Sequence, residues 1–172
     1  MIHLVSVTKE NKHILQNLYQ FYYYDFSQYT KEELNNDGLY DVSMEYYWED
    51  DRWNPYFIYS DDKIVGFLII LFENYDVAPD PTHVIYDFMI LNKYRRNGFG
   101  KEAAMKAFDL FKANWAVAQM RSNEAAILFW RNVIADYTNG TFTELYRKDL
   151  EKYFQSFSTK DSCKSPAESV RN

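Results

Sequence analysis

A turn rich in arginine and glycine, Arg95-Arg96-Asn97-Gly98-Phe99-Gly100, separates an apolar stretch from an alanine-rich stretch. The apolar residues 84–91 predict a strand, and residues 98–112 predict a helix. The first N–H groups of a helix lack partners within it, and the helix dipole adds partial positive charge there. Gly98 and Gly100 carry no side chain that would keep an anion from the backbone. The junction therefore indicates a phosphate or pyrophosphate site, with ordinary surface arginines as the alternative.

The turn lacks the third glycine of the dinucleotide fingerprint and the Gly-Lys-Ser/Thr of the P-loop. It resembles the acyl-CoA turn of the GCN5-related N-acetyltransferase (GNAT) family, Arg/Gln-x-x-Gly-x-Gly/Ala, whose members include uncharacterised bacterial acetyltransferases. The resemblance implies that acetyl-CoA is the co-substrate and that backbone amides of the turn surround its pyrophosphate. The cofactor-binding residues implied here are Arg95, Arg96, Asn97, Gly98, Phe99, Gly100 and Lys101.

The same resemblance implies that the strand before the turn splays from the next strand and that pantetheine binds between them like an added strand. Phe88, Met89 and Ile90 would then bind the arm through their main-chain groups, although their side chains could equally be core residues. Asn123 and Trp130 match the family's second motif, Asn-x-x-Ala-x-x-x-Tyr. Asn123 would bind pantetheine, or it could simply cap a helix.

Trp130 stands where the family often has a tyrosine that protonates the leaving thiolate, and an indole N–H cannot serve as that acid. Three alternatives stay open. The thiolate leaves unassisted, or another tyrosine supplies the proton, or the protein binds acyl-CoA without turnover. The tyrosines considered for this role are Tyr86, Tyr137 and Tyr146.

Acyl transfer to an amine needs a neutral nitrogen, and a carboxylate can take the proton. Asp87 is the candidate catalytic base because it directly precedes the expected pantetheine-binding residues. It also matches an acidic position of spermidine/spermine-type acetyltransferases, whose neighbouring glutamate is replaced here by Tyr86. The alternative is a buried structural acid.

Residues 25–51 hold nine acidic residues and one lysine, next to the aromatic run that ends at Phe26. Acids with aromatic faces suit a cationic amine, whereas a solvated acidic surface is the simpler interpretation. The expected acceptor-binding residues are Tyr24, Asp25 and Tyr86.

The composition narrows the function classes. A net charge of −6 argues against nucleic acid or an anionic membrane as the main partner. The longest apolar run, residues 64–72, is far shorter than the ~20 residues that span a bilayer. With one cysteine, Cys163, no disulfide framework exists, which favours a reducing compartment. We expect a cytoplasmic protein and no metal site.

The periodicity predicts an α/β (α+β) fold. Helices are expected over residues 14–22, 43–49, 98–112 and 123–134, and strands over 3–7, 55–59, 63–72, 84–91, 115–120 and 141–147. Thr8 is the expected cap of the first helix, a loop is expected over 76–81, and Gly66 suggests a bulge or a close approach. The family resemblance, which spans roughly residues 1–147, implies a mixed, mostly antiparallel sheet flanked by helices, with a splay between its two central strands.

We expect one N-acetyltransferase domain over residues 1–157 and a disordered tail over 158–172. The expected activity is acetyl-CoA-dependent acyl transfer to a small amine, which could be cationic. A homodimer is a possible oligomeric state. A non-catalytic acyl-CoA sensor and a structural dimerisation domain are the alternatives, and the intact turn argues against the latter.

Overall fold

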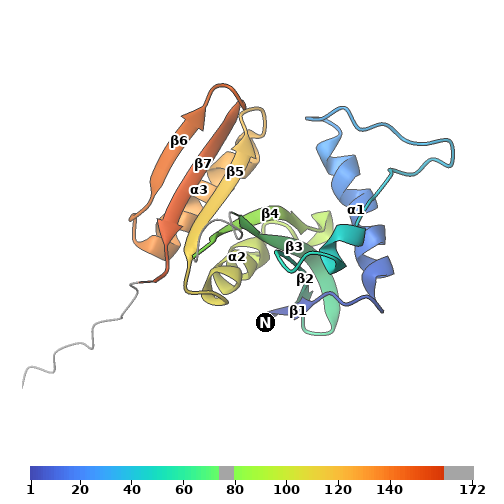
Figure 1. Ribbon diagram of the computed structural model, residues 1–172, viewed down its shortest axis with the longest axis horizontal. Helices are drawn as coiled ribbons and strands as arrows, with labels where there is room; N and C mark the ends of the chain where they lie inside the picture. Colours follow the sequence, from blue (N-terminus) through green and yellow to red (C-terminus); the bar gives the residue numbers. More distant parts are fainter. Residues whose placement is uncertain (74–79, 161–172) are drawn as a thin grey trace, which may run out of the picture.

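The computed structural model describes residues 1–73 and 80–160. Its described strands form a seven-stranded sheet in the order β1-β2-β3-β4-β5-β7-β6 (Figure 1). Neighbouring strands are antiparallel except for β4 and β5, which are parallel. The strands are β1 (Ile2–Ser6), β2 (Trp53–Ser60), β3 (Lys63–Glu73), β4 (Thr82–Ile90), β5 (Asn114–Met120), β6 (Thr143–Arg147) and β7 (Lys152–Ser158). The expected mixed, mostly antiparallel sheet is confirmed.

Helices cover both faces of the sheet (Figure 1). Helix α1 (Lys12–Phe26) packs on one face through the buried stripe Leu15, Leu18, Tyr19 and Tyr22. Helices α2 (Phe99–Asp109) and α3 (Glu124–Thr138) pack on the other face, where alanines of α2 let it lie close to the strands. Two short 3₁₀ helices, η1 (Glu45–Trp48) and η2 (Asn92–Tyr94), lie in the connections. None of the helices in the described ranges has the length and apolarity to cross a membrane.

The two central strands separate part-way along their length. Pairing of β4 with β5 runs from Thr82↔Asn114 to Ile85↔Val117 and stops there, whereas β3 stays paired with β4 as far as Ile90. Because Ile69 pairs with Asp87 and Ile70 with Ile85, Tyr86 is an extra residue in β4, which is a β-bulge. The second half of β4 therefore has no strand partner on its β5 side among the described residues. This opening confirms the expected splay.

Gly66 combines both features expected of it. Val65 is an extra residue between the pairs Ile58↔Gly66 and Tyr59↔Ile64, so β3 has a bulge there. A Cβ on Gly66 would lie 2.0 Å from the carbonyl oxygen of Met89, so β4 approaches closely at this point. The glycine thus fixes the position of the β4 segment that borders the opening.

Three sequence-based expectations were wrong. Residues 141–147 do not hold the last strand, because β7 follows and lies between β5 and β6. The tail does not begin at residue 158, since Thr159 is buried and exchanges hydrogen bonds with the backbone of Ala113. Thr8 does not cap α1, which begins after Asn11. Most of the expected loop over 76–81, and the expected tail from residue 161, lie outside the described residues.

Replacing Gly66 with alanine should lower the free energy of unfolding by about 3 kcal/mol. This is the upper end of the usual cost of overpacking, because the added Cβ would clash with the backbone of Met89. Chemical denaturation measures it. The control is Gly38→Ala, where an added Cβ meets no atom within 4 Å and only the positive φ of 75° is strained. That variant should lose about 1 kcal/mol. Equal losses would contradict the close approach at Gly66.

Candidate functional site

The turn between β4 and α2 contains two residues with positive φ. Arg96 and Gly98 both have left-handed backbone conformations, with φ of 62° and 79°. Gly98 is the N-cap of α2, so the free amides of the first helical turn follow it directly. Successive N–H groups in such a conformation form a concavity for an anion. Backbone and helix dipole together make the turn suitable for a pyrophosphate.

The cations of the turn differ in their partners. Arg95 donates from Nε to the carbonyl oxygen of Ile90 at 2.7 Å and forms an ion pair with Asp25 at the end of α1. Lys101 forms an ion pair with Asp136 of α3 at 2.6 Å. The exposed guanidinium of Arg96 has no such partner within residues 1–73 and 80–160. Arg96 is therefore the cation of the turn that is available to a bound anion.

Gly100 acts through packing. A Cβ added there would lie 3.2 Å from the ring of Phe129 and 3.5 Å from the side chain of Ile90. The absence of a side chain thus lets the start of α2 lie against α3 and β4. Asn97 is exposed, and its side-chain amide donates to the carbonyl oxygen of Arg95 at 3.2 Å.

The start of α3 lies beside the end of β5. Asn123 is the N-cap, and its side-chain oxygen accepts from the amide of Ala126 at 3.1 Å. Its capping role is therefore present, and its side-chain NH₂ group can still donate to a ligand. Trp130 is 5% exposed and packs edge-on against Phe88, with 5.1 Å between ring centroids. Trp130 forms part of the core beneath β4.

Asp87 accepts two hydrogen bonds from α1. The hydroxyl groups of Tyr19 and Tyr22 donate to its two carboxylate oxygens at 2.7 and 2.6 Å. The oxygen of Tyr19 also lies 2.6 Å from that of Tyr47 in η1. Because Tyr19 gives its one proton to Asp87, Tyr47 must donate to Tyr19. All three hydroxyl groups are thus oriented toward one carboxylate.

Burial raises the pKa of the Asp87 carboxyl group above its usual value, while the hydrogen bonds from Tyr19 and Tyr22 oppose that rise. Neither Lys nor Arg pairs with this carboxylate within the described ranges. Each carboxylate oxygen keeps a lone pair free after its bond to tyrosine. Asp87 can therefore accept a further N–H group.

Several aromatic side chains lie near Asp87. Tyr86 is 53% exposed and meets Trp53 edge-on at 4.8 Å between ring centroids, and Trp53 in turn meets Tyr46 at 5.0 Å. Burial, followed by the negative charge of Asp87, raises the pKa values of both Tyr23 and Tyr86. These residues form an aromatic wall, consisting of Tyr23, Tyr46, Trp53 and Tyr86, close to the carboxylate.

The structure brings only some of the expected acceptor residues together. Tyr86 lies beside Asp87, whereas Tyr24 is 72% exposed and is not on the buried stripe of α1. Asp25 is engaged by Arg95. Tyr19 and Tyr22 were not among the expected site residues. Their place on an apolar helical stripe was a signal, because a buried tyrosine hydroxyl usually has a partner.

The tyrosines considered as proton donors lie in different places. Tyr137 donates to Asp109 at 2.8 Å, where α2 and α3 end, away from the turn. Tyr146 packs on Tyr153 in β6 and β7, beyond β5 in the sheet. Tyr86 is the one of the three that lies beside Asp87.

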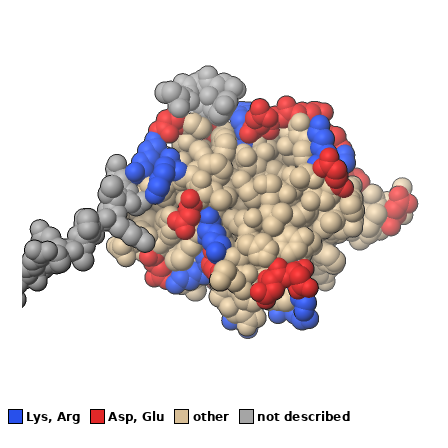
Figure 2. Space-filling model, turned by 90° about the horizontal axis from the view of Figure 1, so that it is seen from below, with Lys and Arg blue, Asp and Glu red and all other residues tan. Residues whose placement is uncertain are grey.

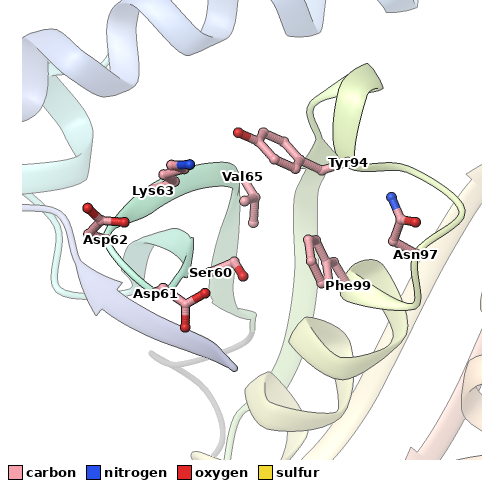
Figure 3. Close-up of a pocket in the computed structure, with 8 residues that line it drawn as sticks. All are labelled: Ser60, Asp61, Asp62, Lys63, Val65, Tyr94, Asn97 and Phe99. Carbon is pink, nitrogen blue, oxygen red and sulfur yellow. The ribbon is translucent and has the colours of Figure 1, made fainter.

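A hollow of about 280 Å³ lies next to the turn, between Tyr94, Asn97 and Phe99 and the tip of the β2–β3 hairpin (Figure 3). It borders β3, so it lies on the opposite side of β4 from the opening toward β5.

Charged residues of both signs surround a broad uncharged area on the face shown in Figure 2. No group of three or more His, Cys, Asp or Glu that could hold a metal ion occurs within residues 1–73 and 80–160.

Residues 13–133, more than half of the sequence, match the family model described as "Acetyltransferase (GNAT) family". The chain belongs to this family. Acetyl-CoA is the acyl donor that the family uses and is the cofactor of this GNAT chain. No curated protein matches the sequence at a significant level.

Solved structures share the fold at low sequence identity. An acetyltransferase from Thermus thermophilus is 15% identical, with a TM-score of 0.67 over 92% of this chain and 97% of the other. The ribosomal-protein-S18-alanine N-acetyltransferase of Escherichia coli is 13% identical, with a TM-score of 0.60 over 100% of both chains. A Bacillus subtilis acetyltransferase in complex with CoA is 10% identical, with a TM-score of 0.54 over 92% and 99%.

Replacing Gly98 with glutamate should lower the affinity for CoA at least about tenfold, or 1.4 kcal/mol, because a carboxylate would stand where the pyrophosphate is expected. Calorimetric titration with CoA measures this. Gly38→Glu is the matched control, since Gly38 has a similar φ of 75° and similarly open surroundings. Both variants should lose similar stability, and an unchanged CoA affinity in folded Gly98→Glu would contradict the assignment of the turn.

Proposed function

We propose that this chain is an N-acetyltransferase that transfers the acetyl group of acetyl-CoA to a small cationic amine. The observation that carries the proposal is Asp87, a desolvated carboxylate with two tyrosine donors, no cationic partner among the described residues and an aromatic wall beside it. Buried charges are usually paired. An ammonium group would supply the missing partner, and aromatic faces would add cation–π attraction.

The donor would bind on the α2/α3 side of the sheet. The turn from Arg95 to Lys101 would hold the pyrophosphate, with Arg96 as the available cation and Gly98 leaving the backbone accessible. Phe88, Met89 and Ile90 would bind pantetheine through main-chain groups for which the described residues provide no partner strand on the β5 side. Asn123 would donate its side-chain amide. When bound, acetyl-CoA supplies the activated acyl group.

The acceptor would bind on the α1 side, where Asp87 and Tyr86 lie. Asp87 would take the proton from the acceptor's ammonium group, leaving the neutral nitrogen that acyl transfer needs. Tyr19 and Tyr22 hold both carboxylate oxygens in place for that step. Asp25 and Tyr24 lie further along α1, so their contribution to the acceptor would be at the entrance.

A non-catalytic acyl-CoA sensor is the second candidate, and one observation favours it. Trp130 occupies the position of the family's usual acid and is buried in the core. As an enzyme, the chain would release the thiolate without a proton donor, because a thiol has a pKa of only ~8.5, or with a proton from Tyr86.

Thiol release from acetyl-CoA, measured against a panel of polyamines, aminoglycosides, amino acids and neutral amines, separates the two functions. The proposal predicts turnover with polyamines or other cationic amines above that with neutral ones. Tight CoA binding with no thiol release from any acceptor would support the sensor instead. Faster turnover with neutral acceptors would contradict the role of Asp87 as a counter-ion.

Asp87→Asn should lower kcat by roughly 10²–10⁴ with nearly unchanged CoA affinity, because the amide keeps the size of the carboxylate but cannot take a proton. Asp109→Asn is the matched control, since Asp109 also accepts a tyrosine hydroxyl, at 2.8 Å from Tyr137, at the far end of α2. Steady-state kinetics and calorimetry give both values. A folded Asp87→Asn variant with wild-type kcat would refute the base.

Tyr22→Phe should move the acid limb of the kcat/KM profile to higher pH. The hydroxyl of Tyr22 holds the pKa of Asp87 down, so its removal raises that pKa, and the base becomes ionised only at higher pH. Tyr137→Phe removes the matching tyrosine hydroxyl from Asp109, away from the turn, and should leave the profile in place. A shift to lower pH, or equal shifts in both variants, would contradict the network.

A further inference from the structure

Gln119 in β5 has a buried side-chain amide. It is 5% exposed, and neither its side-chain oxygen nor its side-chain nitrogen has a partner among the described residues. A buried amide left unpaired costs about 1–3 kcal/mol. Such a group calls for an explanation, and a ligand that reaches the side chain would supply one.

The position of Gln119 is at the opening of the sheet. Pairing of β5 with β4 ends at Val117, two residues earlier, while pairing with β7 continues through Gln119↔Tyr153. Alternation along the strand places Gln119 on the same face as Trp115 and Val117, which belong to the core under α2 and α3. The backbone N–H of Asn123 donates to the carbonyl oxygen of Met120 at 2.9 Å, so the start of α3 adjoins the end of β5 near Gln119.

We propose that Gln119 is a further cofactor-binding residue whose side-chain amide pairs with an amide of the pantetheine arm from the β5 side of the opening. The inference rests on the proposed CoA site. A carboxamide offers one acceptor and an NH₂ donor group, and each secondary amide of pantetheine offers the complementary C=O and N–H. Gln119 would then select donors that carry this arm, whereas the turn selects the pyrophosphate.

A second buried glutamine supplies both the rival explanation and the control. Gln155 of β7 is paired with Val117, so it lies diagonally across from Gln119 on the same face. Its nitrogen donates to Glu144 at 2.8 Å, and its oxygen has no partner among the described residues. If the two glutamines served each other structurally, removing either would destabilise the protein, with no effect on ligand selectivity.

The test compares wild type, Gln119→Met and Gln155→Met by thermal unfolding without ligand and by calorimetric titration. The two probes are CoA and adenosine 3′,5′-bisphosphate, which lacks the pantetheine arm. Gln119→Met should raise the unfolding midpoint by about 2–4 °C, because an unpaired buried amide is removed. It should weaken CoA binding about tenfold and leave the affinity for the bisphosphate unchanged. Gln155→Met should lower the midpoint and leave both affinities unchanged.

The inference is overturned if Gln119→Met binds CoA as tightly as wild type, if it weakens both probes equally, or if it lowers the unfolding midpoint. Failure of the proposed function is seen separately, in the wild-type titration, as an absence of CoA binding.

Discussion

The end of the β4–β5 ladder at Ile85 and Val117 is the constraint on which the site depends. Backbone N–H and C=O groups seldom stay unpaired when they are buried, so an opening in the middle of a sheet needs support on both sides. On one side, the bulge at Tyr86 and the close approach of Gly66 hold β4 against β3. On the other, β7 pairs along all of β5 and keeps it extended without β4. The opening is therefore a stable feature of the sheet.

The two faces of β4 differ in chemistry because side chains alternate along the strand. Phe88 and Ile90 face α2 and α3 in an apolar core beneath the turn from Arg95 to Lys101, while Asp87 and Met89 face α1. The bulge at Tyr86 sets which residues fall on which face. Acetyl-CoA on the α2/α3 face and an amine on the α1 face would meet through the opening. Asp87 would then lie on the same face as the amine. The ion pair between Asp25 and Arg95 joins these two regions across the end of α1.

Most of the sheet could be predicted from the sequence, because the strands alternate and the turn from Arg95 to Gly100 is local in sequence. Strand β7 was missed although Gln155 and Phe157 alternate with exposed residues, since nothing local shows that it inserts between β5 and β6. In the site, Asp87 and Tyr86 could be predicted because they directly precede the expected pantetheine-binding residues 88–90. Tyr19 and Tyr22 contact Asp87 across more than sixty positions of sequence, and such contacts depend on packing that no local pattern encodes. The same holds for the pairing of Asp25 with Arg95.

We propose that the cofactor and the carboxylate meet at the opening of the sheet. A crystal structure of the protein with CoA and a polyamine bound tests it most directly. We expect the pyrophosphate at the amides that follow Arg95 and the pantetheine arm between the separated ends of β4 and β5. We also expect an amine nitrogen within hydrogen-bonding distance of Asp87. CoA bound elsewhere, or β4 and β5 paired along their full length in the complex, would contradict this proposal.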